Sequence, residues 1–530
     1  MNTETDIVEF MQNPENYDDS TTKVEHKQTH ISHVFLTKDF VYKVKKPVNF
    51  GFLDFETLEK RKFYCEEEVR LNKRLCPELY LGVIPITNDN GLSLNGSGKT
   101  VEYAVKMKRM PEETIMKHLL KNDKVSYKEI KKIANILSEF YKNVNCSENI
   151  DNYGKPEMLK QATDQNFEQT EKYVDYIFDG QSYEFIKNAT NRFFIKNKEL
   201  FEIRIKNSKI KEGHGDLHSG NIFIHNGQVC IFDCVEFNKS FRCGDVANDI
   251  AFLAMDLEYF NKCNLAKYLI QKYVDFTHDY NIYALLDFYK CYRAYVRAKV
   301  TAFLTEDKSL SAQKKEELKE EAKNYFQHAY EYAQIFDNQT PAVIISCGVT
   351  ATGKSRWLKV ASDIINAPVL RTDEIRKELF NMREDEKRDE NFYKRYYSEA
   401  SRQMVYDEIF TRAEKIVKNG GKLAIDATFI KAQNRKIAKE LADKYGAEFI
   451  IIHTRANEET IKKRLEQRKK EKNNVSDANI DAYIYQSKNF EEPDEGKVIT
   501  LNTEKEDMEN IKKLRAELGK IFHIRLRNGN

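Results

Sequence analysis

The sequence predicts an α+β half followed by an α/β half with a parallel sheet, and two observations support this prediction. After residue 341, the apolar runs AVIISC, PVLR, KLAIDA, EFIIIH and KVITL alternate with charged segments of helical length. Strands that alternate with helices form a parallel sheet, because each crossover returns the chain to the same edge. Before residue 335, β-rich segments such as HVFLTKDFVYKVKK and TVEYAVKMKRM come first, and helical periodicity follows from about residue 126.

The boundary between the halves is expected near residues 335–341. A charged helix is predicted near residues 310–335, where apolar side chains recur every three or four residues from Leu318 to Ala333 while KKEELKEE stays polar. Its apolar face is expected to dock on the first half, and the polar run DNQTP follows it. We therefore predict a first domain over residues 1–335 and a second domain over residues 341–530.

Composition excludes several classes of protein. The 530 residues include 86 Lys and Arg against 84 Asp and Glu, a formal net charge of +2, so overall charge indicates neither a nucleic acid nor a membrane as partner. The start MNTETDIVEF is unlike a signal peptide, and nowhere do about 18 apolar residues run together. The nine cysteines are scattered and odd in number, which is unlike a disulfide framework. We expect a soluble protein of the cytoplasm.

The first half offers a lysine on a strand and a glutamate on the next helix. The run FVYKVKK carries Lys43, and CEEEVRLNKRL carries Glu67 and Glu68. Such a pair directs an ammonium group toward nucleotide phosphates. Glu67 is assigned as the partner, with Glu68 as the open alternative. Lys45 lies on the same strand face as Lys43, because side chains alternate with period two, and Lys43 is preferred because VYK fits the V-A-x-K frame.

Residues 214–221 read HGDLHSGN, which fits the pattern H-x-D-x-x-x-x-N with His214, Asp216 and Asn221. In this pattern the aspartate accepts the proton of a substrate hydroxyl, and the asparagine five residues later coordinates Mg²⁺. The following run NIFIHNGQVCIFD predicts a β-hairpin, because Asn-Gly separates two short apolar runs. Asp233 ends it as the expected second metal ligand.

These motifs resemble the aminoglycoside phosphotransferase and choline kinase-like family over about residues 25–300. The resemblance implies a protein-kinase-like fold that binds ATP and Mg²⁺. It also implies that Asp245 in FRCGDVANDI braces the catalytic loop, with Asp249 in the adjacent helix. The sequence departs from the family in two places: THISHVF replaces a glycine-rich loop, and Cys234 and Val235 follow Asp233. Glu236 is expected either to add a metal carboxylate or to lie at the surface.

The second half contains GVTATGKS, a complete G-x-x-x-x-G-K-[ST] motif, between a predicted strand and a predicted helix. Gly348 and Gly353 let the loop backbone close around phosphate oxygens. Lys354 reaches the β- and γ-phosphates, and the Ser355 hydroxyl binds Mg²⁺. This P-loop predicts a second ATP site.

Two strand ends supply further candidates for the second site. Asp426 ends the strand KLAIDA, where a carboxylate binds Mg²⁺, and no second acid follows it to activate water for a hydrolytic motor. In LRTDEIRKEL, Asp373 begins a helix and Arg376 lies one turn further. This pair suits a general base and an anion-binding cation. The competing interpretation makes Asp373 a helix cap and Arg376 a surface residue.

The order GVTATGKS, TDEIR, DATF and RLEQR resembles small P-loop kinases, including polynucleotide 5′-hydroxyl kinases and zeta-toxin-like kinases, over nearly all of residues 341–530. The resemblance implies that Asp373 is the general base, that Arg376 and Arg435 bind substrate, and that Arg464 and Arg468 form a lid over the nucleotide. A solvated basic helix is the alternative for the last two. The whole chain resembles bacterial proteins that join an aminoglycoside phosphotransferase-like domain to a P-loop kinase.

These resemblances imply an ATP-dependent kinase with two nucleotide sites, each transferring a γ-phosphoryl group to a hydroxyl. The acceptor is expected to be a small molecule for the first half and a nucleotide, nucleic-acid end or other anion for the second. Two alternatives stay open: the first half regulates an active P-loop kinase, or the P-loop half is an ATP-hydrolysing switch. The sequence decides neither the individual acceptors nor the oligomeric state.

Overall fold

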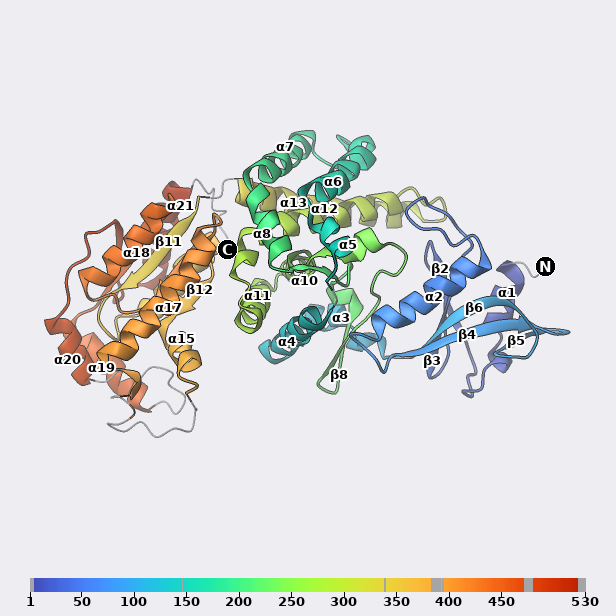
Figure 1. The fold of residues 1–530 in the computed structure, drawn as a ribbon, viewed down its shortest axis with the longest axis horizontal. Coiled ribbons are helices and arrows are strands. Elements are labelled where there is room, and N and C mark those ends of the chain that lie inside the picture. The colour runs from blue at the N-terminus through green and yellow to red at the C-terminus, as the bar shows by residue number, and fades with distance from the viewer. Residues whose placement is uncertain are drawn as a thin grey trace. The chain divides into compact units, whose positions relative to one another are not determined.

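The computed structural model describes residues 4–144, 146–337, 340–382, 392, 395–470 and 480–522. The chain divides into two compact units (Figure 1). The first comprises Met1–Asp279 with Leu286–Ala333, and the second comprises Tyr280–Leu285 with Gln334–Asn530. Both predicted fold classes are confirmed: the first unit contains an antiparallel sheet followed by helices, and the second contains a parallel sheet.

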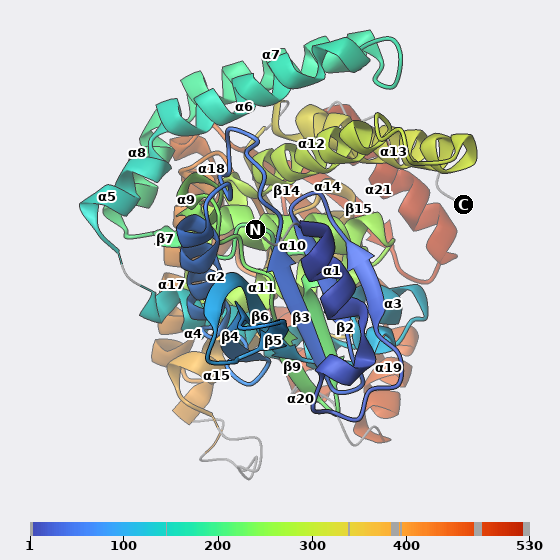
Figure 2. The ribbon, with the colours of Figure 1, turned by 90° about the vertical axis from the view of Figure 1, so that its right-hand side faces the viewer.

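The first unit begins with a six-stranded antiparallel sheet in the order β1-β2-β3-β6-β4-β5. Its strands are β1 (Glu25–Gln28), β2 (Ser32–Leu36), β3 (Phe40–Lys45), β4 (Tyr80–Asn88), β5 (Leu92–Leu94) and β6 (Lys99–Lys108). Tyr42 and Val44 of β3 pack with α1 (Glu4–Gln12), which lies in front of the sheet in Figure 2. Because side chains alternate along a strand, Lys43 and Lys45 face the opposite side. There they meet α2 (Leu58–Asn72).

The rest of the first unit is mainly helical, with two small two-stranded sheets in which β7 pairs with β10 and β8 pairs with β9. Its elements are α3 (Met116–Lys121), α4 (Tyr127–Asn143), α5 (Glu148–Asp151), α6 (Pro156–Thr170), α7 (Gly180–Lys196), α8 (Lys198–Lys206), β7 (Ile210–Glu212), β8 (Ile222–His225), β9 (Gln228–Ile231), α9 (Lys239–Arg242), β10 (Cys243–Asp245), α10 (Val246–Tyr259), α11 (Cys263–Thr277), α12 (Leu286–Leu304) and α13 (Ala312–Asp337). The long helix α13 packs through aromatic pairs, with Tyr325 stacked on Tyr259 and Phe326 stacked on Phe178.

One disulfide corrects the expectation from the cysteine pattern. Cys76, in the turn after α2, is bonded to Cys230 of β9, and 154 residues separate them in sequence. The other seven cysteines are free. The odd number and irregular spacing argued against a framework of several bonds, but they carry no information on a single pair that folding brings together.

The second unit contains a five-stranded parallel sheet in the order β12-β13-β11-β14-β15, with helices on both faces (Figure 1). Its elements are β11 (Ala342–Cys347), α14 (Lys354–Ile365), β12 (Val369–Arg371), α15 (Thr372–Leu379), α17 (Glu399–Val417), β13 (Lys422–Asp426), α18 (Ala432–Lys444), β14 (Glu448–Arg455), α19 (Glu458–Lys470), α20 (Ile480–Lys488), β15 (Lys497–Asn502) and α21 (Asp507–Phe522). Trp357 and Leu358 of α14 and Leu514 of α21 pack on one face of the sheet. No helix in the described ranges is both long and apolar enough to cross a membrane.

Candidate active sites

The first candidate site surrounds Lys43 on β3. Its Nζ lies 2.9 Å from Oε1 of Glu68 on α2 and 3.1 Å from Oδ1 of Asp233, which follows β9. Burial acts to lower the pKa of Lys43, but Asp233 and Glu68 raise it well above its usual value. The ammonium therefore stays charged, and 15% of the Lys43 side chain and 45% of the Asp233 side chain are exposed. A phosphate-binding lysine needs this combination of charge and access.

The partner of Lys43 is Glu68, which corrects the assignment to Glu67. Successive helical residues are rotated by about 100°, so only one of two neighbours faces the strand. Glu68 is fully buried there, and burial acts to raise its pKa, but Lys43 and the other strand lysine lower it to about 2. Glu67 instead binds Arg70 at 2.7 Å and lies 3.6 Å from Arg242.

Lys45 forms a second ion pair that the sequence analysis missed. Its Nζ donates to Oε2 of Glu68 at 2.7 Å and to Oε1 of Glu236. The Lys45 side chain is 0% exposed and that of Glu236 is 4% exposed. Glu236 is therefore not a surface residue. Its carboxylate binds Lys45 and does not serve as the additional metal ligand that was the other expectation. Of the two lysines on this face, Lys43 is the one that reaches solvent.

Asp216 lies in the loop between β7 and β8, where two donors meet its Oδ2. Nδ2 of Asn221 lies 3.2 Å from this oxygen, and Nε2 of His218 lies 3.4 Å from it. The backbone N–H of Gly220 donates to Nδ1 of His218 at 3.0 Å, so neutral His218 carries its proton on Nε2, facing Asp216. No hydrogen bond reaches Oδ1 of Asp216 from the described residues. Oδ1 is thus available to accept a proton from a hydroxyl group.

A second histidine joins this loop to the segment that carries Asp233. The backbone N–H of Asp216 donates to Nδ1 of His214 at 3.2 Å, and Nε2 of His214 lies 2.8 Å from the carbonyl oxygen of Phe232. Burial lowers the pKa of His214, which favours the neutral ring. Because Nδ1 accepts, Nε2–H donates to Phe232, and the ring sets the spacing between Asp216 and Asp233.

The acid that braces the loop is Asp249, not Asp245 as the resemblance implied. The Asp249 carboxylate accepts the backbone N–H groups of His214 at 2.8 Å and Gly215 at 3.1 Å. Asp245 instead caps the N-terminus of α10 and pairs with the buried Arg204 at 2.6 Å. Asp249 lies one turn into α10, which places its carboxylate rather than that of Asp245 against the loop.

Asn221 and Asp233 fit the expected Mg²⁺ ligands, because Mg²⁺ prefers amide and carboxylate oxygens. Nδ2 of Asn221 donates to Asp216, which leaves the amide oxygen available to bind a cation. Asp233 has a backbone φ of 62°, a left-handed conformation that is uncommon for residues other than glycine. Such conformations cluster at functional sites.

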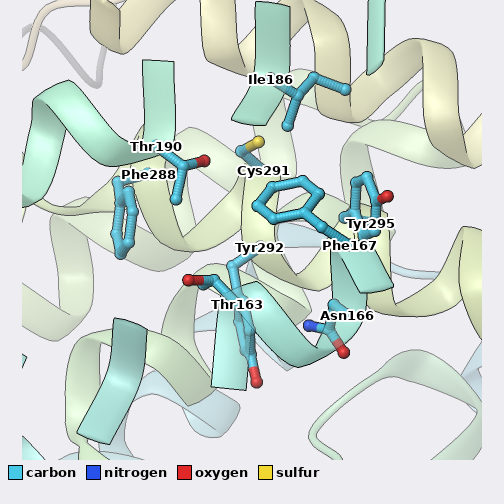
Figure 3. Close-up of a pocket in the computed structure, with 9 residues that line it drawn as sticks. All are labelled: Thr163, Asn166, Phe167, Ile186, Thr190, Phe288, Cys291, Tyr292 and Tyr295. Atoms are coloured by element: carbon cyan, nitrogen blue, oxygen red, sulfur yellow. The ribbon is translucent and has the colours of Figure 1, made fainter. Parts of the chain in front are cut away.

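Two hollows in the helical part of the first unit differ in capacity. Figure 3 shows the smaller one, where Phe167 of α6, Thr190 of α7 and Cys291 and Tyr295 of α12 surround a volume of about 10 Å³. This is room for roughly one water molecule. The larger one is open and has a volume of about 740 Å³. It is lined by Lys117, Lys121, Tyr259, Phe260, Gln313, Glu316, Glu317, Glu320, Glu321 and Asn324.

The second candidate site lies at the carboxyl end of β11, where residues 348–355 lead into α14. Gly348 has φ 142° and Gly353 has φ 90°, and a Cβ on Gly348 would lie 2.6 Å from a carbonyl oxygen of β14. The close approach requires glycine at that position. Nζ of Lys354 donates to the carbonyl oxygen of Val349 at 2.8 Å. Because Lys354 and Ser355 begin α14, its N-terminal N–H groups can bind an anion.

Asp426 and Asp373 lie at the same edge of the sheet as the P-loop. Asp426 ends β13, and Asp373 follows β12, whose Arg371 pairs in register with Asp426. Oγ of Ser346 on β11 lies 3.4 Å from Oδ1 of Asp426. Parallel strands bring their carboxyl ends to one edge, which is where open α/β sheets bind ligands. The oxygens of Asp426 and Ser355 fit Mg²⁺ by their chemistry.

Arg376 lies beside Asp373, with Nη1 2.9 Å from Oδ1 of the carboxylate. Its guanidinium also lies over the ring of Tyr397 at 4.4 Å, and 7% of the residue is exposed. Its buried Nε has no hydrogen-bond partner among the described residues. Arg376 is therefore not a surface residue. The helix cap position belongs to Arg371, so Asp373 is not the cap either.

Arg435 does not bind substrate in this arrangement, which corrects its expected role. It is fully buried, and its guanidinium bonds to Glu495 at 2.7 Å, to the carbonyl oxygen of Phe429 at 2.9 Å and to that of Glu492 at 3.1 Å. An arginine whose donors are used internally in this way holds chain segments together. Spacing alone could not distinguish this role from substrate binding.

Arg464 lies against the P-loop itself. Its Nη1 donates to the carbonyl oxygen of Ala351 at 3.2 Å, and its Nη2 donates to that of Thr503 at 2.8 Å. These contacts connect α19 to the loop and to the segment after β15. The side chain of Arg468, on the same helix, lies outside the described residues.

A protein-family model matches part of the second unit, and curated relatives match most of the chain. Residues 343–493 match the family model described as AAA domain. Uncharacterized proteins of Mycobacterium tuberculosis and Mycobacterium bovis are 28% identical over 416 residues, which cover 78% of this chain and 80% of each relative. The C-terminal unit is a P-loop domain similar to that family.

Several of the similar solved structures are described as kinases. A choline/ethanolamine kinase family protein from Mesorhizobium loti is 7% identical, with 62% of this chain and 97% of that chain covered, at a TM-score of 0.36. A putative kinase from Chloroflexus aurantiacus is 20% identical, with 34% and 98% covered, at a TM-score of 0.28. The Mycobacterium tuberculosis APS kinase is 16% identical, with 34% and 98% covered, at a TM-score of 0.25. At TM-scores below 0.5, these likenesses assign no activity.

Proposed function

We propose that the chain is an ATP-dependent phosphotransferase with two nucleotide sites, one in residues 1–335 and one in residues 341–530. Each site transfers the γ-phosphoryl group of ATP to a hydroxyl, with Mg²⁺ as cofactor. Each combines a lysine for phosphate, an acid for the metal and a separate acid for the acceptor proton. In the first site these residues are Lys43, Asp233 and Asp216. In the second site they are Lys354, Asp426 and Asp373.

The arrangement of Asp216 is the observation that supports this proposal most strongly. Its Oδ2 meets Asn221 and His218, while Oδ1 is left to accept a proton. Lys43 meanwhile contacts Asp233, the proposed metal ligand. Bound Mg²⁺ neutralises charge on the β- and γ-phosphate oxygens. A protein that only bound nucleotide would not need a second, separately oriented carboxylate beside the metal site.

The acceptors are proposed by class. For the first half we propose a small molecule. For the second half we propose an anionic acceptor, such as a nucleotide or a nucleic-acid end. The buried Arg376, whose Nε has no partner among the described residues, supports this class.

A transfer screen tests the proposal. The full chain is incubated with γ-labelled ATP and Mg²⁺ against metabolite pools that include amino alcohols, and against oligonucleotides with 5′-hydroxyl ends. Asp216→Asn and Lys354→Ala are run in parallel, with the partly exposed Asp164→Asn of α6 as the control. We expect each site variant to lose a different set of labelled products and the control to lose none.

The outcomes separate the alternatives. Products that depend on Lys354 alone would make the first half a regulator. Release of labelled phosphate at the same rate with and without acceptors would make the P-loop half a hydrolysing switch. If the second half transfers phosphate, Arg376→Ala should raise the acceptor KM and leave the ATP KM unchanged, and unchanged acceptor kinetics would contradict the anionic class.

A further inference from the structure

Helix α20 (Ile480–Lys488), the next described element after α19, packs on the P-loop. Ile480 and Tyr483 of α20 join a small apolar cluster with Val349 and Ala351 of the loop and with Leu465 of α19. Helix α20 therefore lies next to the loop.

Internal bonds hold the chain just after α20 in place. The backbone N–H of Glu491 donates to the carbonyl oxygen of Ile430 at 2.9 Å. The buried Arg435 binds the Glu492 carbonyl oxygen and the Glu495 carboxylate. Arg435 thus anchors the segment that leads out of α20, which gives a reason for the burial of this arginine.

One side chain of α20 contacts the P-loop backbone directly. Oε1 of Gln486 accepts the N–H of Thr350 at 2.7 Å. Only the oxygen of a carboxamide can accept this bond, so the contact determines which way the amide group is turned. The Nε2 group of Gln486 makes no hydrogen bond to any residue that the structure describes.

The position of Lys354 indicates which part of a nucleotide Gln486 would meet. Nζ of Lys354 donates a hydrogen bond to the carbonyl oxygen of Val349, the residue directly before Thr350. A P-loop lysine reaches the β- and γ-phosphates. The Thr350 N–H and the amide docked on it therefore lie near the terminal phosphate and away from the base.

We propose that Gln486 is a further nucleotide-binding residue, whose Nε2–H₂ group donates to an oxygen of the terminal phosphoryl group while its Oε1 stays bound to Thr350. The inference rests on the proposed function, because it needs ATP in the loop of residues 348–355. It assigns to α20 a role in distinguishing ATP from ADP.

The single tryptophan of the chain supplies a local readout. Trp357 lies on α14, and a Cβ built on Gly353 of the P-loop would be 3.5 Å from its Cδ1 atom. Fluorescence excited at the red edge, where tyrosine does not absorb, therefore reports the P-loop site of the full chain. Titrations with ADP and with a non-hydrolysable ATP analogue, both with Mg²⁺, give the two dissociation constants.

Gln486→Glu is the decisive variant, because it keeps an oxygen for Thr350 and replaces the donor with a negative acceptor. We expect it to weaken binding of the ATP analogue by about tenfold or more, as loss of a hydrogen bond to a charged group does, and to change ADP binding by less than about twofold. Ser487→Glu is the matched control, because it adds the same charge at an exposed neighbour on the same helix. It should leave the ratio of the two dissociation constants unchanged.

Four other results would count against the inference. Equal losses for ADP and the ATP analogue would make Gln486 only a support of the loop. Tighter binding in Gln486→Leu would mean that the amide blocks the loop. A wild-type binding signal that persists unchanged in Lys354→Ala would overturn the proposed nucleotide site itself. A wild-type site that depends on Lys354 but is insensitive to Gln486→Glu would refute the role of Gln486 alone.

Discussion

Replacing Lys45 by methionine should destabilise the first unit much more than replacing Lys43, although the two lysines are two residues apart on one strand. The Lys45 side chain is 0% exposed, and its ammonium is the cation bound to Glu236, whose side chain is 4% exposed. Removing one partner of a buried ion pair costs about 3–5 kcal/mol, because the remaining charge is left without a partner. We expect that loss in the free energy of unfolding for Lys45→Met.

Lys43→Met should cost less free energy of unfolding than Lys45→Met, because it leaves no fully buried charge without a partner. Lys45 remains bound to Glu68 in that variant, and the Asp233 side chain is 45% exposed, so water can solvate it. The same variant should abolish nucleotide binding at the first site, because Lys43 is the lysine that contacts Asp233. Stability and binding are therefore expected to separate between the two variants.

Thermal unfolding followed by circular dichroism measures the stability difference. An unfolding entropy of about 2.1 cal/mol/K per residue makes 1 kcal/mol equal to roughly 1.5 °C in a unit of this size, so Lys45→Met should lower Tm by roughly 4–7 °C. The exposed Lys38→Met is the matched control and should leave Tm unchanged. Calorimetric titration with ATP in a Lys354→Ala background measures binding at the first site.

Two results would refute this reasoning. A wild-type Tm for Lys45→Met would mean that the buried pair with Glu236 contributes no net stability. Nucleotide binding that survives in Lys43→Met but disappears in folded Lys45→Met would exchange the roles of the two lysines.

Three further predictions concern other parts of the chain. Burial acts to raise the pKa of Asp216, but His218 helps to lower it below its usual value. His218→Gln should therefore raise the pKa of Asp216 and move the acid limb of the kcat–pH profile of the first site to higher pH. An unchanged pH profile would contradict the contact between the two side chains. Arg435→Met should lower the free energy of unfolding of the second unit by about 3–5 kcal/mol, because it leaves the buried Glu495 without its partner. Unfolding followed by tryptophan fluorescence measures this loss. Wild-type stability together with a raised acceptor KM would instead indicate that Arg435 binds substrate. Alkylation of the denatured, unreduced chain should label seven of the nine cysteines, and labelling of Cys76 or Cys230 would contradict the disulfide.

The sequence by itself determined the two fold classes and the positions of the short motifs. Each of the two motifs, the P-loop and the HGDLHSGN loop, is one continuous stretch of chain. Over so few residues, the separation along the chain also limits the distance between the side chains. The parallel strands were recognisable because each is an apolar run between charged helices. The convergence of Asp426 and Asp373 near the P-loop also follows from sequence, because parallel strands bring their carboxyl ends to one edge.

Only the tertiary structure decided which candidate residue performs a given role. The choice of Glu68 over Glu67 depends on the rotation of α2 about its axis, and a shift of one residue turns a side chain by about 100°. The choice of Asp249 over Asp245 depends on how α10 meets the loop, and the internal role of Arg435 depends on a segment about 60 residues further along the chain. The bond between Cys76 and Cys230 joins positions 154 residues apart. Local patterns describe the chemistry that a residue can perform, whereas packing between distant segments selects the partner with which it does so.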